Sequence, residues 1–96
     1  MQIARPPNGF RITEKPLALQ TLAAATESTP WLQKAYSNIK ERLRMTGHMT
    51  GHALGESACR RVFIDVDPTT NAKRFAVSYT VLGDGVTIHK LLVLVN

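Results

Sequence analysis

The dipeptide Asp84-Gly85, which lies between two alternating apolar segments, limits the possible fold of this chain more than any other feature. Asp-Gly in a two-residue loop is typical of a tight β-hairpin, because both positions must accept a positive φ angle. This loop places Gly83 opposite Val86 and Thr80 opposite His89. The sequence therefore predicts an antiparallel hairpin of defined register, since a shift by one residue would exchange its two faces.

The predicted pairing divides the side chains of this hairpin into two faces. The apolar face holds Phe75, Val77, Tyr79, Val81, Ile88, Leu92 and Leu94. The opposite face holds Arg74, Ala76, Ser78, Thr80, Thr87 and His89, followed by Leu91 and Val93. Burial of each large apolar side chain is worth about 1.5–3 kcal/mol, but a hairpin alone is only marginally stable. We therefore expect helices on the apolar face and a working surface on the mainly polar face.

Two helices are predicted before this hairpin. The first covers residues 16–26, which are rich in leucine and alanine and begin with Pro16, a residue tolerated in the first turn. The second begins at Pro30 with Thr29 as its N-cap, and it ends at Gly47. Its apolar residues recur every three or four positions, so one side of this helix is expected to face the core.

Alternating segments predict the strands, at residues 10–13, 59–66, 73–82 and 86–94. Three glycines within residues 47–55 predict a loop there. The expected order is β-α-α-β-β-β, an α+β fold in which an antiparallel sheet packs on two N-terminal helices. Residues 1–9 contain Pro6-Pro7 and Asn8-Gly9 and are expected to form a flexible N-terminal arm, so the single folded domain covers residues 10–96.

The composition favours an anionic partner. The 96-residue chain carries a formal charge of +5, and its isoelectric point is about 9.9. Such a surface suits nucleic acid, the ribosome or an acidic protein, although it can also serve solubility alone. The single cysteine, Cys59, excludes an internal disulfide and fits a reducing compartment. No segment is apolar enough for a membrane span or a secretory signal, so we expect a cytoplasmic protein without a membrane partner.

Cofactor and metal chemistry find little support in the sequence. His48 and His52 are four residues apart and His89 could be a third ligand, but no HExxH or CxxC pattern accompanies them. There is no phosphate-binding glycine motif and no GxSxG around any serine. We therefore expect neither a metal nor another cofactor.

The remaining candidates are the cationic side chains near the predicted strands. Arginine offers a planar fork of donors for phosphate oxygens, and histidine exchanges a proton near neutral pH. Such groups could hold an RNA backbone and stabilise charge during phosphodiester cleavage. We predict nucleic-acid binding by Arg60, Lys73, Lys90, Arg42 and Arg44. The structural alternatives are an ion pair of Arg61 with Asp65 and a Lys90 that extends from the sheet edge into water.

The segments RRVFIDV (60–66), KRFAVSYTV (73–81) and DGVTIH (84–89) resemble the RelE/ParE toxin superfamily. Its members have a strand, two helices and a β-meander. The resemblance implies a toxin that is neutralised by a cognate antitoxin protein. Members of the RelE type are metal-independent endonucleases that cut mRNA on the ribosome through attack by the 2′-hydroxyl. The positions that match their catalytic residues are Arg61, Arg74 and His89.

Two alternatives stay open at this point. The chain ends at Asn96, without the tail in which many nucleases of this superfamily keep a tyrosine or histidine. The resemblance therefore also allows a ParE-type toxin directed at DNA gyrase. The second alternative is a non-enzymatic phage or plasmid protein that binds or inhibits a partner through its sheet face or edge, or that forms a homodimer. Apolar Leu91, Val93 and Val95 beside the cations favour such a contact.

Overall fold

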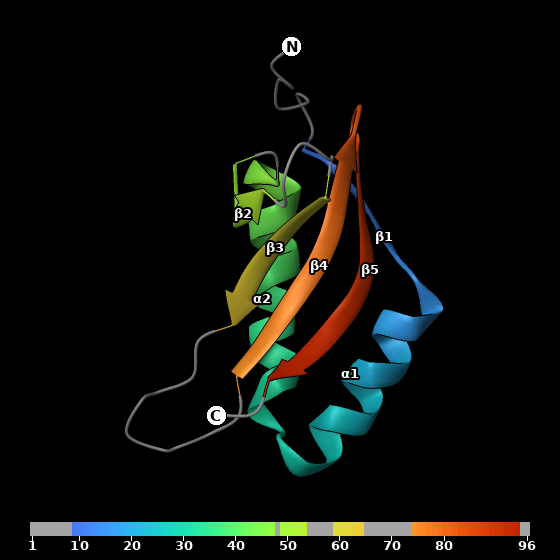
Figure 1. Cartoon of the computed structure of the whole chain (residues 1–96), viewed down its shortest axis with the longest axis vertical. Coiled ribbons are helices and arrows are strands. Elements are labelled where there is room, and N and C mark those ends of the chain that lie inside the picture. Colours follow the sequence, from blue (N-terminus) through green and yellow to red (C-terminus); the bar gives the residue numbers. More distant parts are fainter. Residues whose placement is uncertain (1–8, 48, 54–58, 65–73, 95–96) are drawn as a thin grey trace.

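The computed structural model describes residues 9–47, 49–53, 59–64 and 74–94, with the backbone only for Arg74 and Leu94. The elements follow in the order β1 (Arg11–Glu14), α1 (Pro16–Ser28), α2 (Trp31–Thr46), β2 (His52–Ala53), β3 (Cys59–Ile64), β4 (Arg74–Leu82) and β5 (Gly85–Leu94) (Figure 1). This order confirms the predicted α+β arrangement. The two-residue strand β2 is an addition, because only a loop was predicted there. The N-terminal arm to residue 8, the turn at 67–71 and Lys73 lie outside the described residues.

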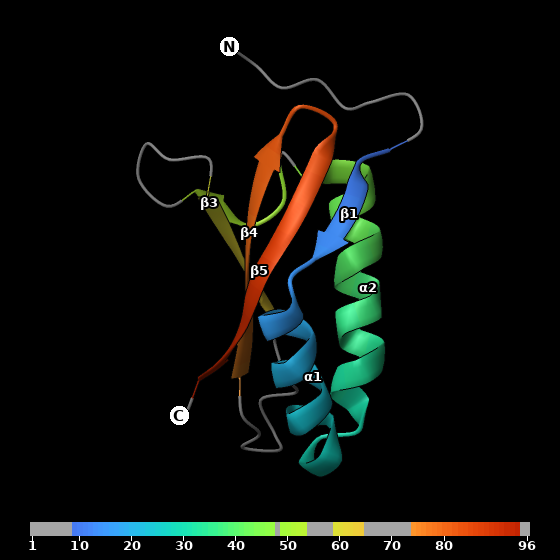
Figure 2. The ribbon, with the colours of Figure 1, turned by 90° about the vertical axis from the view of Figure 1, so that its right-hand side faces the viewer.

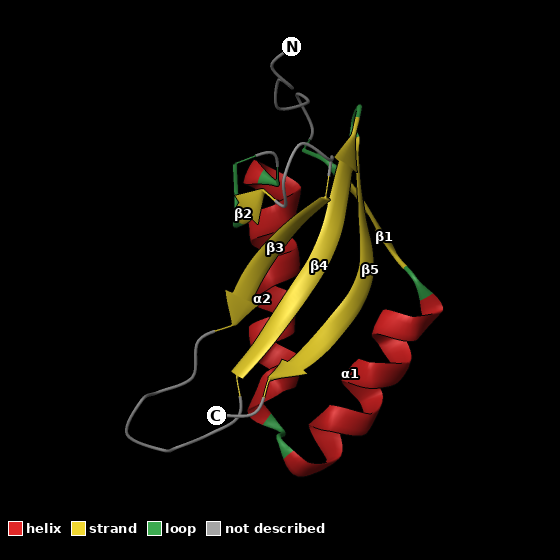
Figure 3. Ribbon diagram, viewed as in Figure 1, coloured by secondary structure: helices red, strands yellow, loops and turns green. Residues whose placement is uncertain are grey.

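The five strands form one sheet in the order β1-β5-β4-β3-β2. Strands β3, β4 and β5 form the predicted antiparallel meander. Strand β1 joins the edge of β5 in parallel, so the sheet is mixed. Both helices lie on one side of the sheet, and the described helices leave its other side open (Figures 2 and 3). We call these the helix-covered face and the uncovered face.

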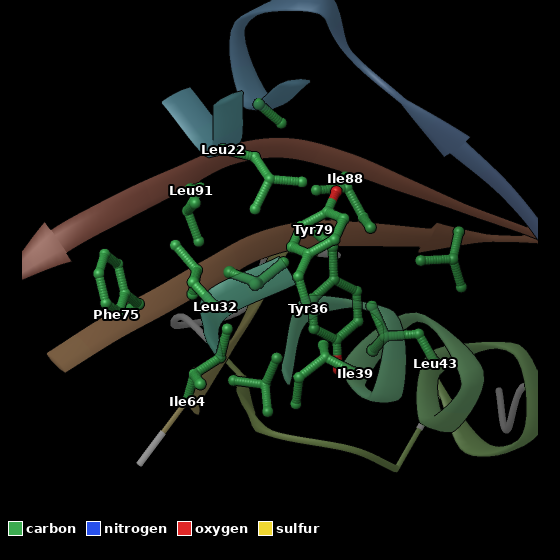
Figure 4. Close-up of a cluster of buried hydrophobic side chains, with 14 of the residues drawn as sticks. Leu22, Leu32, Tyr36, Ile39, Leu43, Ile64, Phe75, Tyr79, Ile88 and Leu91 are labelled. Atoms are coloured by element: carbon green, nitrogen blue, oxygen red, sulfur yellow. The ribbon is translucent and has the colours of Figure 1, made fainter. Parts of the chain in front are cut away.

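The core lies between the helices and the helix-covered face (Figure 4). Helix α2 contributes one buried stripe at the predicted period, formed by Leu32, Tyr36, Ile39 and Leu43. Helix α1 contributes Ala18 and Leu22. The sheet contributes Val62, Ile64, Phe75, Val77, Tyr79, Val81, Val86, Ile88 and Leu91. Burial of this set orients the sheet, so the intervening residues of each strand face the uncovered side.

The hairpin register was predicted wrongly, because the chain turns one residue earlier than expected. Leu82 pairs with Gly85, so the loop residues are Gly83 and Asp84. Gly83 takes the positive φ angle, at +59°. This register places Val81 opposite Val86, and both are buried in the core. Both registers place Val81 and Val86 on the helix-covered face. They differ further along, where the predicted register would direct Lys90 toward the core opposite Tyr79.

A β-bulge at His89 changes the pattern further along β5. Tyr79 pairs with Ile88, but Ser78, the residue before it in β4, pairs with Lys90. His89 is therefore an extra residue, and the alternation of side chains reverses after it. Leu91 is consequently buried at 4% exposure rather than on the polar face.

The same reversal corrects the prediction for the end of β5. Leu92 pairs with Ala76 on the uncovered face, where the sequence predicted a core position. Val93 pairs with Phe75 on the helix-covered face and is 43% exposed. The predicted apolar stripe of Leu91, Val93 and Val95 on the polar face was therefore wrong for its first two members, and Val95 lies outside the described residues.

Helix α2 also begins differently from the prediction. Pro30, not Thr29, occupies the N-cap position, and no side-chain hydrogen bond caps the helix. The helix ends at Gly47 as predicted, and the glycine allows a close approach to β5. A Cβ atom there would lie 2.6 Å from the carbonyl oxygen of Leu43 and 2.8 Å from Cγ2 of Val86.

Candidate functional site

Cross-strand pairing organises the uncovered face into three rows of side chains, because paired residues of neighbouring strands share a face. The cationic row crosses four strands and contains His52, Arg61, Ser78 and Lys90. The apolar row beside it contains Phe63, Ala76 and Leu92. On the other side of the cationic row, the hydroxyl row contains Cys59, Thr80 and Thr87.

One hydrogen bond holds His89 over the hydroxyl row. Its Nε2 atom lies 2.5 Å from Oγ1 of Thr80, a residue of the uncovered face. A histidine held in this way presents an imidazole whose ring nitrogens can accept or donate a hydrogen bond. The predicted outward orientation of His89 follows from ordinary alternation after the buried Ile88, although the predicted pairing with Thr80 was wrong, since Thr80 pairs with Thr87.

Arg61 and Lys90 flank Ser78 in the cationic row. Ser78 is 8% exposed, whereas Lys90 is exposed to solvent. The Nε atom of Arg61 is buried and has no hydrogen-bond partner among the described residues. Two cations on either side of a hydroxyl provide donors for a phosphate group. Asp65, the ion-pair partner predicted for Arg61, lies outside the described residues.

The structure does not bring Arg74 close to the other two predicted catalytic residues. Its backbone is six residues along β4 from Thr80, the partner of His89. At the rise of a β-strand this separates the two Cα atoms by roughly 20 Å. Arg61 pairs with Ser78, only two residues from Thr80. Arg61, His89 and Lys90 therefore form one group, and Arg74 lies at the far end of the sheet.

Arg60 was predicted to bind nucleic acid, but it faces away from the uncovered face. It pairs with Tyr79, a core residue. Its Nε atom donates to the carbonyl oxygen of Thr50 at 2.8 Å, and its Nη2 atom donates to that of Gly51 at 3.0 Å. The hydroxyl of Tyr79 donates toward the carbonyl oxygens of Gly47, at 3.1 Å, and Thr50. Arg60 and Tyr79 thus fasten residues 47–51 to the sheet.

The electrostatics of this attachment centre on Tyr79. Burial raises the pKa of the Tyr79 hydroxyl above its ordinary value, while the hydrogen bond and charge of Arg60 oppose that rise. Tyr79 therefore stays a neutral donor at physiological pH. Its role, like that of Arg60, is structural.

The two arginines predicted on the second helix lie on the other side of the molecule from the uncovered face. Arg42 is exposed on α2. Arg44 forms an ion pair with Glu41, with Nη2 and Oε1 2.5 Å apart. The structure therefore brings neither of them together with Arg61 and Lys90. The fifth predicted residue, Lys73, lies outside the described residues.

Sequence reasoning missed Phe63 as a site residue and considered His52 only as a possible metal ligand. His52 belongs to β2 and pairs with Arg61. Its ring centroid is 6.3 Å from that of Phe63, with the ring planes at 55°. A two-residue strand is too short to show a periodicity in the sequence. The preceding Gly51, however, was a sequence signal that the chain there approaches another backbone closely. It has a φ of +72°, and a Cβ atom there would collide with the carbonyl oxygen of Arg61.

A shared metal site of His52 and His89 does not fit this geometry. They lie on β2 and β5, which are separated by three strand spacings, or roughly 14 Å. Within the described part of the chain, no three His, Cys, Asp or Glu side chains are grouped to hold a metal ion. His48, the other predicted ligand, lies outside that part.

Comparisons of this chain with protein-family models, with curated proteins and with solved structures find no match. The RelE/ParE resemblance therefore stays a prediction from the sequence motifs. In the part of the chain that the structure describes, neither helix has the length and apolar character needed to cross a membrane.

Proposed function

We propose that this protein is a cytoplasmic RNA-cleaving toxin of the RelE/ParE type, which holds its substrate on the uncovered face of the sheet. The observation that carries the proposal is the grouping of Arg61, Lys90 and His89 on a face that neither described helix covers. The strand, helix pair and β-meander are also the elements that the resemblance implies. A cognate antitoxin and ribosome-bound mRNA are the partners that follow from this proposal.

The proposed chemistry needs no cofactor. Neutral His89 accepts the proton of an RNA 2′-hydroxyl as that oxygen attacks the adjacent phosphorus. The guanidinium of Arg61 and the ammonium of Lys90 stabilise the extra negative charge on the phosphate oxygens. The bond to the 5′ oxygen then breaks, and solvent supplies the proton that this leaving oxygen takes up. The products are a 2′,3′-cyclic phosphate and a 5′-hydroxyl.

The test combines induction in bacteria with mapping of the cleaved transcripts from the induced cells. We expect the wild type to arrest growth and cleave transcripts, and we expect His89→Asn and Arg61→Gln to lose both effects while remaining folded. Arg42→Gln is the matched control, since it removes one exposed arginine from the helical side of the molecule. Harmless expression of a folded wild type that leaves transcripts intact would contradict the proposal.

A second candidate function is non-enzymatic binding of a protein partner, gyrase included. It is favoured by the apolar row and by the edge of β3, where β2 pairs only with Arg60 and Arg61. Among the described strands, residues 62–64 have no neighbour on that edge. An open edge can pair with a strand of a partner or of a second copy. A protein that stays monomeric by light scattering and retains no partner in pull-downs would speak against it.

A further inference from the structure

The apolar row lies directly beside the cationic row, and one of its members is aromatic. Resting on the proposed function, we infer that Phe63 binds a base of single-stranded RNA while Arg61 and Lys90 hold a phosphate of the same nucleotide segment. Phe63 takes no part in the cleavage step. It determines which part of an RNA reaches Arg61 and His89.

The spacing of the two rows supports this division. Phe63 and Arg61 are two residues apart on β3, so they share a face and their Cα atoms are roughly 7 Å apart. That distance is comparable to the separation between the base and the phosphate of one nucleotide, so one cation and one ring can contact the same nucleotide. Proteins that bind single strands commonly combine cations along the backbone with aromatic side chains for the bases.

The neighbours of Phe63 also suit a flat ligand. Across the sheet it pairs with Ala76, which has no exposed surface, and Ala76 pairs with Leu92. Ala76 is therefore covered, and a planar group would lie on the outer surface of the two larger side chains beside it, Phe63 and Leu92. On the other side, the ring of His52 extends the aromatic surface toward β2.

This arrangement selects unpaired RNA. Bases in a duplex are stacked on each other and paired, so they cannot lie on an aromatic side chain of a protein. A single strand offers its bases freely, and base–aromatic stacking tolerates every sequence because each base has a π face. We therefore expect weak sequence preference and a strong preference for single-stranded over double-stranded RNA.

The experiment measures binding by fluorescence anisotropy across a series of salt concentrations. The probe is a short single-stranded RNA with 2′-O-methyl groups, which cannot be cleaved. We expect Phe63→Leu to lower the affinity at least about fivefold without changing the slope of log K against log salt, because stacking releases no counterion. Arg61→Gln should instead reduce that slope by about 0.7. Lys34→Gln, which removes an exposed cation of α2 that the site does not use, is the control.

A second probe, with one abasic position moved along the RNA, identifies the stacked base. With the abasic site at one position, the affinity of the wild type should fall by the same factor by which Phe63→Leu lowers the affinity for the intact RNA. The affinity of Phe63→Leu should be the same for this abasic RNA and for the intact RNA. Equal binding of the intact and abasic probes by both proteins overturns the inference, and the proposed function stands if cleavage persists. If the folded wild type binds no RNA, the inference is overturned, and the proposed function is decided separately by growth arrest and transcript cleavage on induction. A Phe63→Leu variant that loses only self-association identifies a protein contact and also overturns the inference.

Discussion

The hydroxyl of Tyr79 offers the sharpest test of how the sheet holds residues 47–51. Tyr79 is fully buried, and its hydroxyl is directed at two carbonyl oxygens, those of Gly47 and Thr50. The Thr50 oxygen also accepts a hydrogen bond from Arg60. Tyr79→Phe keeps the ring in the core but removes this donor.

The expected loss of stability follows from the carbonyl group that loses its hydrogen bond. Arg60 continues to donate to Thr50, so the loss falls on the carbonyl of Gly47, which is itself a buried residue. Leaving one buried polar group without its partner costs about 1–3 kcal/mol. We expect a decrease of about 2 kcal/mol in the free energy of unfolding. In a domain of this size that decrease lowers Tm by roughly 8–16 °C.

The assay is thermal and urea unfolding followed by circular dichroism. The matched control is Ser37→Ala, which also removes a hydroxyl bonded to a carbonyl oxygen, in this case that of Gln33 on the exposed side of α2. Its stability should stay within about 0.5 kcal/mol of the wild type. A Tyr79→Phe variant within the same limit would refute the reasoning, because the hydroxyl would then contribute nothing to the attachment.

Three further predictions concern other residues of the fold. Arg60→Gln should lower Tm but leave the salt dependence of RNA binding unchanged, since Arg60 bonds carbonyl oxygens and does not lie on the uncovered face. A reduced salt slope would contradict this. In urea unfolding, Gly51→Ala should lower the stability of the fold by more than Gly83→Ala does. Both glycines have a positive φ angle, but only at Gly51 would the added Cβ collide with other atoms. Equal losses of stability would contradict this. Burial raises the pKa values of Tyr36 and Tyr79, so the unfolded chain loses its tyrosine protons first and stability should fall as the pH rises above about 10. Tyrosinate absorbance should then appear together with unfolding, and its appearance in the folded protein would contradict the burial of both hydroxyls.

Most of the fold was predictable because its signals are local. The period of α2, the glycine at its end and the alternation in β3 and β4 each follow from residues close in sequence. The hairpin register was not predictable in the same way. Two turns were available, at Gly83-Asp84 and at Asp84-Gly85, and both keep Val81 and Val86 on one face of the sheet. They differ further along the hairpin, where an Asp84-Gly85 turn with regular pairing would direct Lys90 toward the core opposite Tyr79. That difference depends on tertiary packing, which a local pattern does not contain.

The candidate site was predictable only in part, for two physical reasons. Charge alone does not separate Arg60 from Arg61, since both are arginines of one strand. Their different roles arise because alternation directs one toward the carbonyl oxygens of residues 50 and 51 and the other toward the uncovered face. His52 joins the site through a two-residue strand, which depends on the close approach of Gly51 to β3 and not on any periodicity.

The bulge at His89 connects the packing of the sheet with its proposed chemistry. In a regular strand, consecutive side chains lie on opposite faces, so His89 and Lys90 could not both face the same side. The extra residue removes this restriction: His89 contacts Thr80, and Lys90 pairs with Ser78, both on the uncovered face. The same change of phase returns Leu91 to the core. A single inserted residue thus places an imidazole and an ammonium on the uncovered face without removing an apolar side chain from the core, and this is the arrangement that the proposed proton transfer beside a bound phosphate uses.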